Sequence, residues 1–582
     1  MPDGSFPTVE DLANPATREI LLKQHGLTVS LKPADTALKL LVGPESCRIA
    51  LVATRKNQFS EIDIEANGAV IDNVWHPVRP ADKDQTIVWL NTNGFKLGPC
   101  AFADVMALRS KESQAPCQVF YVQDGKESTR EVSLDGLITN ATPYPYQVKG
   151  INYLTFMKRS GVGCVLADEM GLGKTLQIIG FLLLQKGSAG KSIVIAPATL
   201  VENWRRELSK FAPSLKVIFR TAGRRDFELN AFDDCECVVT SYDTAVTDIG
   251  FLSRFDWENV ILDEAQYIKN PNANRTKSVK RLRRKFSVAV SGTPFENHLT
   301  DTWSLTDFVF EGYLGRLREF EARFAETLED AETLSWVLEP LILRRLVKDV
   351  AKDLPERIDI PVFFDPPQML VQAQDEILAR VKATGNMLPE IQNLRTLAAH
   401  ANEQAKLSAS PKFEYLKNAI WEILSRNEKA LIFTSFNNVS QELSEWLQTG
   451  WATSYVNAIN GSTKMKLRQT IIDEFTNAKN GVLVLNPQAA GVGLNITAAS
   501  HVFHFNPEWN PSLTEQASKR AHRNGQKLPV TVHYMFYSRT IEELVASSQE
   551  FKLAIGKALV PGVLLPLSEK AAIKRLTEWG KS

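Results

Sequence analysis

Residues 168–175 have the types and spacing of a loop that holds the phosphates of a nucleotide. The segment reads Asp168-Glu169-Met170-Gly171-Leu172-Gly173-Lys174-Thr175. Flexible glycines let backbone N–H groups turn toward the phosphates, Lys174 can reach the β- and γ-phosphates, and Thr175 can hold Mg²⁺. Asp168 stands where the general phosphate-loop pattern has its first glycine. Taken alone, the match is therefore imperfect.

A pair of acids follows a later apolar run and could complete a metal–nucleotide site. Asp263 and Glu264 come directly after Val260-Ile261-Leu262. Asp263 at a strand end can hold Mg²⁺, directly or through water, and Glu264 can orient the attacking water. Adjacent acids after a strand are often only a solvated turn. The combination with Lys174 and Thr175 favours the catalytic interpretation.

Two further groups have chemistry that suits a nucleotide. Arg520 and Arg523 are three residues apart, hence on one helical face, where two guanidinium groups can meet a transferring phosphate. A surface arginine pair bound to carboxylates is the alternative. Gln147 lies ahead of the loop, and its amide can both donate to and accept from an adenine edge, although an ordinary surface glutamine would look the same.

The elements that must position these residues alternate between buried strands and helices. Strands are predicted at Cys164–Ala167, Ser192–Pro197, Cys237–Tyr242, Val260–Leu262 and Val288–Pro294, and again at Ala430–Ser435, Gly481–Leu485 and His501–Phe505. Helices are predicted after the loop, at Leu176–Leu184, and over residues 366–424. Such alternation predicts parallel, doubly wound sheets with ligands at the carboxyl ends of the strands.

The N-terminal region has a different texture. Short alternating runs at Leu27–Leu31, Ala37–Leu41, Ile49–Val52, Ile87–Leu90 and Gln118–Val122 predict a separate β-rich domain with sandwich or small-barrel spacing. Residues 8–25 could form short helices, and Trp75 is predicted to be a core residue. We expect a packing or docking module that could bind a protein partner.

Composition limits the remaining possibilities. A chain of 582 residues with 44% hydrophobic residues predicts roughly three to four globular domains. The 67 basic residues balance 67 acidic ones, so nucleic acid would have to bind a local patch. The basic stretch Arg275–Lys285 is better explained as a helix with a solvated cationic face than as a phosphate-binding patch.

The six cysteines are expected to be reduced, and those at 235 and 237 to lie on a strand. Without a membrane span or a leader, we expect a cytoplasmic location, at the nucleoid in a bacterium, or a nuclear one in a eukaryote.

These segments together resemble the Swi/Snf-type ATPases of helicase superfamily two. Motifs I, II and III are matched by Asp168–Thr175, by Asp263-Glu264-Ala265-Gln266 and by Ser291-Gly292-Thr293-Pro294, and Asp168 is that family's usual first residue. Gln516–Gln526 resembles motif VI, Gly491–Asn495 resembles motif V, and Leu341–Arg345 with Asp353-Leu354-Pro355 resembles the segment joining the family's two lobes. Asn486–Ala490 departs from the family pattern before motif V.

The resemblance implies an α/β fold with two RecA-like doubly wound parallel-sheet lobes and helical insertions, preceded by the β-rich domain. The boundaries would be 1–135 for the β-rich domain, 136–345 for lobe one, 346–424 for the linker and helical insertion, 425–545 for lobe two, and 546–582 for a helical tail.

It also implies roles for single residues. Catalysis would use Lys174, Asp263, Glu264 and the arginine fingers Arg520 and Arg523. ATP would be bound by Gln147, by the loop residues Asp168, Glu169, Met170, Gly171, Leu172, Gly173, Lys174 and Thr175, and by Gly493, with Mg²⁺ at Thr175 and Asp263. DNA would meet Asn203, Thr240, Ser241, Ser435, Gly461, Ser462, Thr463 and Trp509, and coupling would involve Gln266, Ser291, Thr293 and Gln516.

The function that follows is that of a DNA-dependent ATPase. It would move along double-stranded DNA, use ATP and Mg²⁺, and displace or remodel bound protein. A strand-separating helicase is one alternative, although no wedge element is evident. A nucleotide-gated DNA clamp, in a bacterial defence or repair system, is another, although the retained Glu264 and arginine pair favour turnover.

Overall fold

The computed structural model describes residues 28–543 with gaps at 31, 43–46, 57, 67, 124–132, 135, 188–189, 222–231, 233, 293–298, 326, 351–353, 385–387, 401–406, 408–409, 488–495, 509–510 and 524. Thr293, Gly493 and Trp509 lie outside the described residues, as do the helices expected over 8–25 and the tail at 546–582. In the described part of the chain, no helix is long and apolar enough to cross a membrane.

The chain forms two compact units. One comprises Met1–Ser133, Asn152–Gly163 and Gly312–Leu314, and the other comprises Leu134–Ile151, Cys164–Glu311 and Gly315–Ser582.

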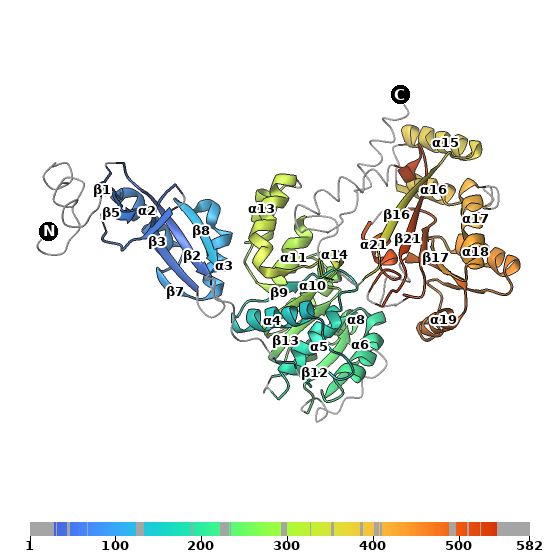
Figure 1. Ribbon diagram of the computed structural model, residues 1–582, viewed down its shortest axis with the longest axis horizontal. Helices are drawn as coiled ribbons and strands as arrows, with labels where there is room; N and C mark the ends of the chain where they lie inside the picture. The colour runs from blue at the N-terminus through green and yellow to red at the C-terminus, as the bar shows by residue number, and fades with distance from the viewer. Residues whose placement is uncertain are drawn as a thin grey trace, which may run out of the picture. The chain divides into compact units, whose positions relative to one another are not determined.

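The first unit contains mixed sheets with helices (Figure 1). One sheet has the order β4 (Gln58–Glu61), β3 (Cys47–Arg55), β2 (Asp35–Val42), β8 (Gln118–Gln123), with β7 (Gly98–Cys100) paired to β3. A smaller sheet has the order β1 (Thr28–Val29), β6 (Val74–Pro77), β5 (Gly68–Ile71). Helices α2 (Pro80–Thr92) and α3 (Phe102–Ser110) lie between these strands in sequence. Trp75 is 1% exposed, so its predicted place in the core is confirmed.

One predicted strand of this unit is wrong. Residues 87–90 belong to helix α2, where Lys83, Thr86 and Leu90 are buried at helical spacing. Pro80 occupies the first turn, where its fixed backbone angle and missing N–H favour a helix start. The β-branched residues in the run at 87–90 favour a strand locally, but the helix start at Pro80 places the run in a helix. The unit is therefore rich in strands but is not a pure β-sandwich or barrel.

Lobe one, in the second unit, is built on a sheet whose described pairings are all parallel. Its order is β11 (Val217–Arg220), β12 (Cys237–Ser241), β10 (Ser192–Ala196), β13 (Trp257–Asp263), β14 (Arg284–Val290), β9 (Cys164–Leu166), β15 (Ile342–Leu343). Its helices are α4 (Pro145–Arg159), α5 (Lys174–Leu184), α6 (Ala198–Phe211), α8 (Tyr242–Thr247), α9 (Ile249–Leu252), α10 (Asn274–Lys280), α11 (Leu299–Val309), α12 (Leu317–Arg323), α13 (Leu328–Leu338) and α14 (Val347–Val350). The predicted doubly wound fold is confirmed here.

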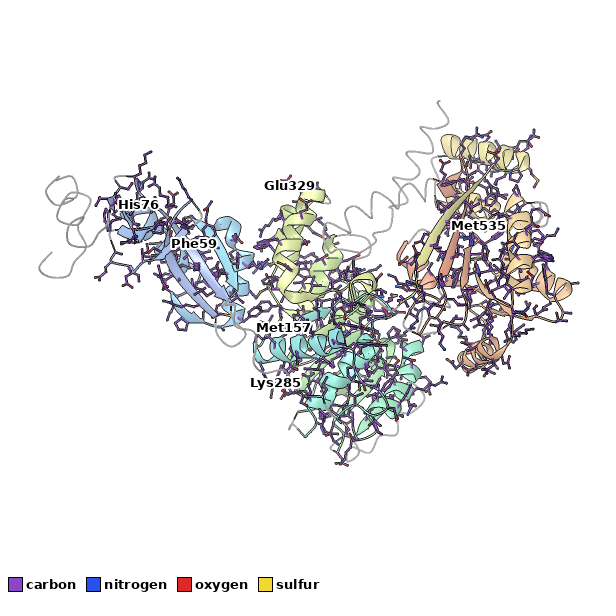
Figure 2. The ribbon with its side chains drawn as sticks, in the orientation of Figure 1. Phe59, His76, Met157, Lys285, Glu329 and Met535 are labelled. Atoms are coloured by element: carbon purple, nitrogen blue, oxygen red, sulfur yellow. The ribbon has the colours of Figure 1, made fainter. Side chains whose placement is uncertain are left out.

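Lobe two has a second sheet whose described pairings are also parallel. Its order is β16 (Arg357–Phe364), β21 (Val530–Tyr537), β20 (His501–His504), β17 (Lys429–Phe433), β19 (Gly481–Leu485), β18 (Tyr455–Ile459). The predicted helices over 366–424 are α15 (Gln368–Thr384), α16 (Leu388–Ala398) and α17 (Pro411–Ser425), and α18 (Asn437–Gly450), α19 (Met465–Asn477) and α21 (Pro511–Ser518) follow. Strand β16 comes from within residues 346–424, so the sheet of lobe two starts before the predicted boundary at 425. Met535 of β21 is fully buried in this lobe (Figure 2).

Two smaller expectations can be compared with the structure. The six cysteines are free thiols, as predicted. Cys237 begins strand β12, whereas Cys235 lies just before the strand, and both are buried. The basic stretch begins in helix α10 but continues into β14, so it is not one helix. Lys280 in this stretch is paired with Asp307 at 2.6 Å.

Candidate nucleotide site

The phosphate loop turns on two glycines that connect β9 to α5. Gly171 and Gly173 have φ values of 92° and 72°, in the left-handed region that favours glycine. A Cβ at Gly173 would lie 2.4 Å from Nε2 of Gln147. That Nε2 donates to the carbonyl of Leu172 at 3.1 Å, and the Gln147 side-chain oxygen accepts from the N–H of Tyr144 at 2.9 Å. The predicted adenine reader therefore braces the loop itself.

Asp168 is held by the junction between the lobes. Its carboxylate is fully buried and accepts from Nε of Arg345 at 2.8 Å, from the Arg345 Nη2 atom and from Gln177 Nε2 at 3.0 Å. Nη2 of Arg345 also donates to the Gln177 side-chain oxygen at 2.8 Å. A buried carboxylate needs such partners. The aspartate in place of glycine thus ties the loop to Arg345, and its side chain faces this network.

Lys174 lies at the start of α5 and points back into the loop. Its Nζ donates to the backbone carbonyl of Asp168 at 2.8 Å. Burial lowers the pKa of Lys174, while the charges of Glu264, Asp168 and Asp263 act in the opposite direction. Lys174 of motif I therefore interacts electrostatically with the acids of motif II, although the two motifs are far apart in the sequence. Thr175 follows in the same turn and is partly exposed.

Asp263 ends β13 with both carboxylate oxygens engaged. Oδ2 accepts from the indole N–H of Trp204 at 2.8 Å, and Oδ1 accepts from the N–H of Glu264 at 3.0 Å. Burial, reinforced by the neighbouring Glu264, raises the pKa of Asp263 to about 7. Glu264 itself has φ 50° and ψ 55°. A non-glycine residue in this region stores backbone strain, which is common at functional sites.

The predicted coupling residues of motifs II and III form a short chain. Gln266 Nε2 donates to Glu264 Oε2 at 2.8 Å, and Ser291 Oγ donates to Gln266 Oε1 at 2.7 Å. The ends of β13 and β14 are thereby connected through side chains. Gln516 is buried on α21 in lobe two and has no contact with this chain among those described.

The two arginines of lobe two come to the loop of lobe one. A Cβ at Gly171 would lie 3.0 Å from the Cβ of Arg523. Burial and the adjacent Arg523 lower the pKa of Arg520 to about 10, while Glu264 of motif II opposes the shift. Burial also lowers the pKa of Arg523, against the charge of Glu207. The guanidinium groups thus lie close enough to carboxylates of lobe one to interact with them electrostatically.

Two other loop residues have packing partners. Leu172 is fully buried beside Tyr146 and Val347. Met170 lies against Gly292 of motif III, where a Cβ would come within 2.7 Å of the methionine Cγ. Glu169 joins lobe two and is described below.

The predicted DNA contacts of lobe one are engaged within the lobe. Thr240 is fully buried and donates to the carbonyl of Arg220 at 2.9 Å. Ser241 caps α8 by accepting from the N–H of Thr244 at 3.1 Å. Neither hydroxyl is available to a DNA phosphate in this structure. Asn203 is partly exposed on α6 and donates to Glu207 at 3.1 Å.

The predicted contacts of lobe two lie after its strands. Gly461 and Ser462 are exposed and Thr463 partly exposed, in the loop between β18 and α19. Asn460 orders this loop, since its Oδ1 accepts from the N–H of Ser462 at 3.1 Å and from the hydroxyl of Thr463 at 3.2 Å. Ser435 follows β17 and donates to Glu508, whose pKa burial raises to about 7 against the pull of Arg395.

Sequence reasoning assigned no site role to Trp204, Arg344 or Arg345. Arg344 donates to the carbonyls of Ala167 at 2.9 Å and Gly292 at 3.3 Å, so it ties motif I to motif III. The consecutive arginines were noticed only as part of the joining segment. Their charge in an otherwise apolar run was the signal that could have found them.

The residues present fit a magnesium nucleotide. The glycine turns let Gln147 and Arg523 approach the loop more closely than a Cβ would allow, and Lys174, Arg520 and Arg523 supply positive charge. Among the described residues, no group of three or more metal-binding side chains occurs. Mg²⁺ usually takes one or two carboxylates and completes its shell with water and phosphate oxygens. Asp263 and Thr175 are the residues that would hold it.

Comparison with known proteins gives two family matches. The SNF2-related domain model matches residues 146–446, and the helicase conserved C-terminal domain model matches residues 411–525.

Similar proteins come from several organisms. YwqA of Bacillus subtilis (strain 168), whose name describes a candidate ATP-dependent helicase/translocase, is 34% identical over 448 residues, covering 72% of this chain and 48% of YwqA. Zorya protein ZorD of Escherichia coli O139:H28 is 32% identical over 430 residues, covering 64% of this chain and 40% of ZorD. The chain thus spans less than half the length of these relatives. The Sulfolobus solfataricus SWI2/SNF2 ATPase core in complex with dsDNA is 32% identical, with a TM-score of 0.40 over 74% of this chain and 95% of that one.

Proposed function

The chain belongs to the SNF2-related family, and from that premise we propose that it is an ATP-dependent translocase on double-stranded DNA. One observation carries the proposal: Arg523 of lobe two lies against Gly171 in the phosphate loop of lobe one. A site completed by the second lobe can couple hydrolysis to movement between the lobes.

The residues divide the chemistry between them. Lys174 and the loop N–H groups bind the phosphates, and the bound Mg²⁺ supplies neutralising charge. Glu264 orients the attacking water, and Gln266 holds the Glu264 carboxylate at 2.8 Å. Arg520 and Arg523 stabilise the charge that develops on the transferring phosphate.

Double-stranded DNA is the proposed track, with backbone contacts at the carboxyl ends of the lobe-two strands. The loop at 460–463 supports this, because Gly461 and Ser462 are exposed directly ahead of helix α19. A helix N-terminus of this length favours a phosphate. Balanced overall charge makes such local contacts necessary. Displacement of bound protein would follow from movement along the duplex.

The test compares ATP hydrolysis without nucleic acid and with single-stranded DNA, duplex DNA and RNA. Lys174→Ala and Glu264→Gln should abolish turnover, whereas Lys186→Ala, an exposed lysine at the other end of α5, should not. Duplex DNA should stimulate the rate most, and a triplex-forming strand should be displaced. Stimulation by RNA alone would refute the proposal, and opening of a forked duplex would indicate a strand-separating helicase instead.

A further inference from the structure

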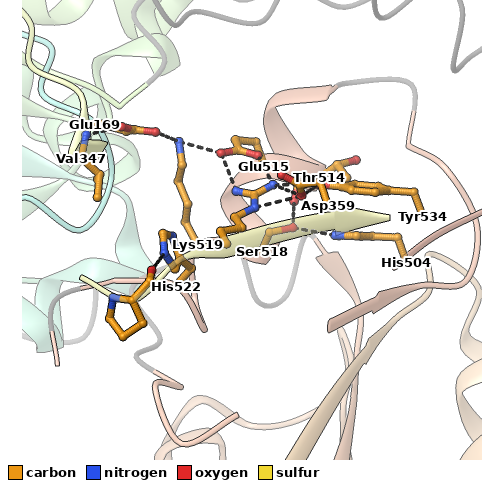
Figure 3. Close-up of polar contacts among 12 residues, drawn as sticks. Glu169, Val347, Asp359, His504, Thr514, Glu515, Ser518, Lys519, His522 and Tyr534 are labelled. Carbon is orange, nitrogen blue, oxygen red and sulfur yellow. Dashed lines mark hydrogen bonds and ion pairs between the residues drawn. The ribbon is translucent and has the colours of Figure 1, made fainter. Parts of the chain in front are cut away.

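An ion pair joins the phosphate loop to lobe two. Nζ of Lys519 lies 2.5 Å from Oε1 of Glu169 (Figure 3). The two side chains are 11% and 17% exposed, so water screens the pair weakly. Glu169 is the second residue of the loop, and Lys519 directly precedes Arg520. Glu169 is expected to bind ATP only as a member of the loop, and no role has been assigned to Lys519.

The Glu169 end of this pair is fixed by the lobe junction. Its Oε2 accepts from the N–H of Val347 at 2.5 Å, and its own N–H donates to the carbonyl of Arg345 at 3.0 Å. Burial opposes ionisation, but Lys519 and the N–H of Val347 lower the pKa of Glu169 overall. The carboxylate is therefore charged at neutral pH, and the loop, the junction and lobe two meet at it.

The Lys519 end is braced against the sheet of lobe two. Its Nζ lies 2.9 Å from Oε1 of Glu515, one helical turn earlier. Glu515 accepts two hydrogen bonds from Arg357, each 2.9 Å long. Arg357 begins β16 and also donates to the hydroxyl of Tyr534 on β21 at 2.7 Å. Charges of alternating sign therefore run from the phosphate loop to two strands of lobe two, as Figure 3 shows.

We propose that Lys519 is a positioning residue for ATP hydrolysis, which by pairing with Glu169 sets how closely Arg520 and Arg523 approach the phosphate loop. This inference rests on the proposed function. Lys519 and the arginines share one short segment, so a displacement of Lys519 displaces the guanidinium groups as well. Transition-state contacts depend steeply on such displacements, whereas binding of the nucleotide to lobe one does not.

The experiment replaces Lys519 by methionine, which keeps the length of the side chain and removes its charge. We expect kcat to fall roughly 100-fold, as for a misplacement of about 1 Å. The KM for ATP and the affinity for duplex DNA should stay near wild type, whereas the melting temperature should fall, because Glu169 and Glu515 both lose a largely buried partner. Lys519→Arg should restore most of the rate. Lys417→Met is the matched control, because Lys417 pairs at 3.5 Å with Glu414 on an exposed helix face.

A double-variant cycle with Glu169→Gln separates positioning from a general structural role. If the pair acts as a unit, Glu169→Gln with Lys519→Met should be no slower than the slower single variant. Independent, multiplying losses would overturn the inference, as would a KM for ATP in Lys519→Met that rises in parallel with the fall in kcat. A wild-type protein without nucleic-acid-stimulated hydrolysis would refute the proposed function itself. Normal wild-type stimulation with an unchanged kcat in Lys519→Met would refute this inference alone.

Discussion

Replacing Arg345 by methionine should both destabilise lobe one and weaken ATP binding. Arg345 is the principal partner of the fully buried Asp168, to which it donates from Nε at 2.8 Å and from Nη2. Without it, Gln177 at 3.0 Å is the donor that still faces the carboxylate in this network. Removing one partner of a buried ion pair costs about 3–5 kcal/mol. For a domain of this size, the lower figure corresponds to a melting temperature roughly 6–12 °C below wild type.

Arg220→Met is the matched control for this variant. Arg220 pairs with Asp248 at 2.6 Å in the same lobe, and their side chains are 10% and 14% exposed. Both variants should lower the melting temperature measured by differential scanning fluorimetry. Only Arg345→Met should raise the KM for ATP, because only its pair anchors the phosphate loop. Equal KM values for the two variants would refute the anchoring role, and melting at the wild-type temperature would refute the buried-pair argument.

Three further expectations follow from single contacts. Arg523→Ala should lower kcat at least 100-fold with little change in ATP affinity, since a finger acts on the transition state; stopped-flow binding and steady-state rates would reveal equal losses if this were wrong. Trp204→Phe removes the indole donor to Asp263 and should cost about 1–3 kcal/mol of transition-state stabilisation, which the ratio of kcat/KM values measures, with unchanged values arguing against it. Burial raises the pKa of Glu508 from 4.5 to about 7, so the folded state holds an extra proton between these values and stability should fall by roughly 3 kcal/mol as pH rises through that window. Urea unfolding at several pH values should show this contribution to the slope in the wild type, and Glu508→Gln should remove it while the contribution of Asp263 remains.

In the two lobes, the predicted strands were mainly the central ones, whose residues are buried on both faces. Cys164–Leu166 and Ser192–Ala196 are buried throughout, and central parallel strands read as continuous apolar runs for that reason. The missed strands β11, β16 and β18 lie at or near sheet edges, where partly exposed residues interrupt the pattern. In β16, exposed and partly buried positions alternate from Asp359 onward. Pairing across the chain, rather than local pattern, makes this segment a strand.

The candidate site divides in the same way. The residues of motifs I and II were proposed from type and spacing, because phosphate and Mg²⁺ chemistry restricts which side chains can serve, whereas the role of the motif VI arginines came from the family resemblance. The roles of Arg345 and Lys519 do not follow, because each depends on a partner more than a hundred residues away. Asp168 and Glu169 look like loop acids until those partners are known. The sequence shows the sign of each side chain's charge, but it does not show which side chain of opposite charge will pair with it.

The contacts of the phosphate loop explain how nucleotide binding could affect the lobe junction directly, without a long chain of intervening residues. Arg344 binds the carbonyl of Ala167, Arg345 binds Asp168, and Lys519 binds Glu169, so consecutive loop residues each contact the junction or lobe two. A ligand shifts a conformational equilibrium only through contacts that differ between the states. A nucleotide that moves the backbone at these positions must change all three contacts at once. The position of lobe two and the occupancy of the site therefore depend on the same few atoms, and coupling between them requires no further element.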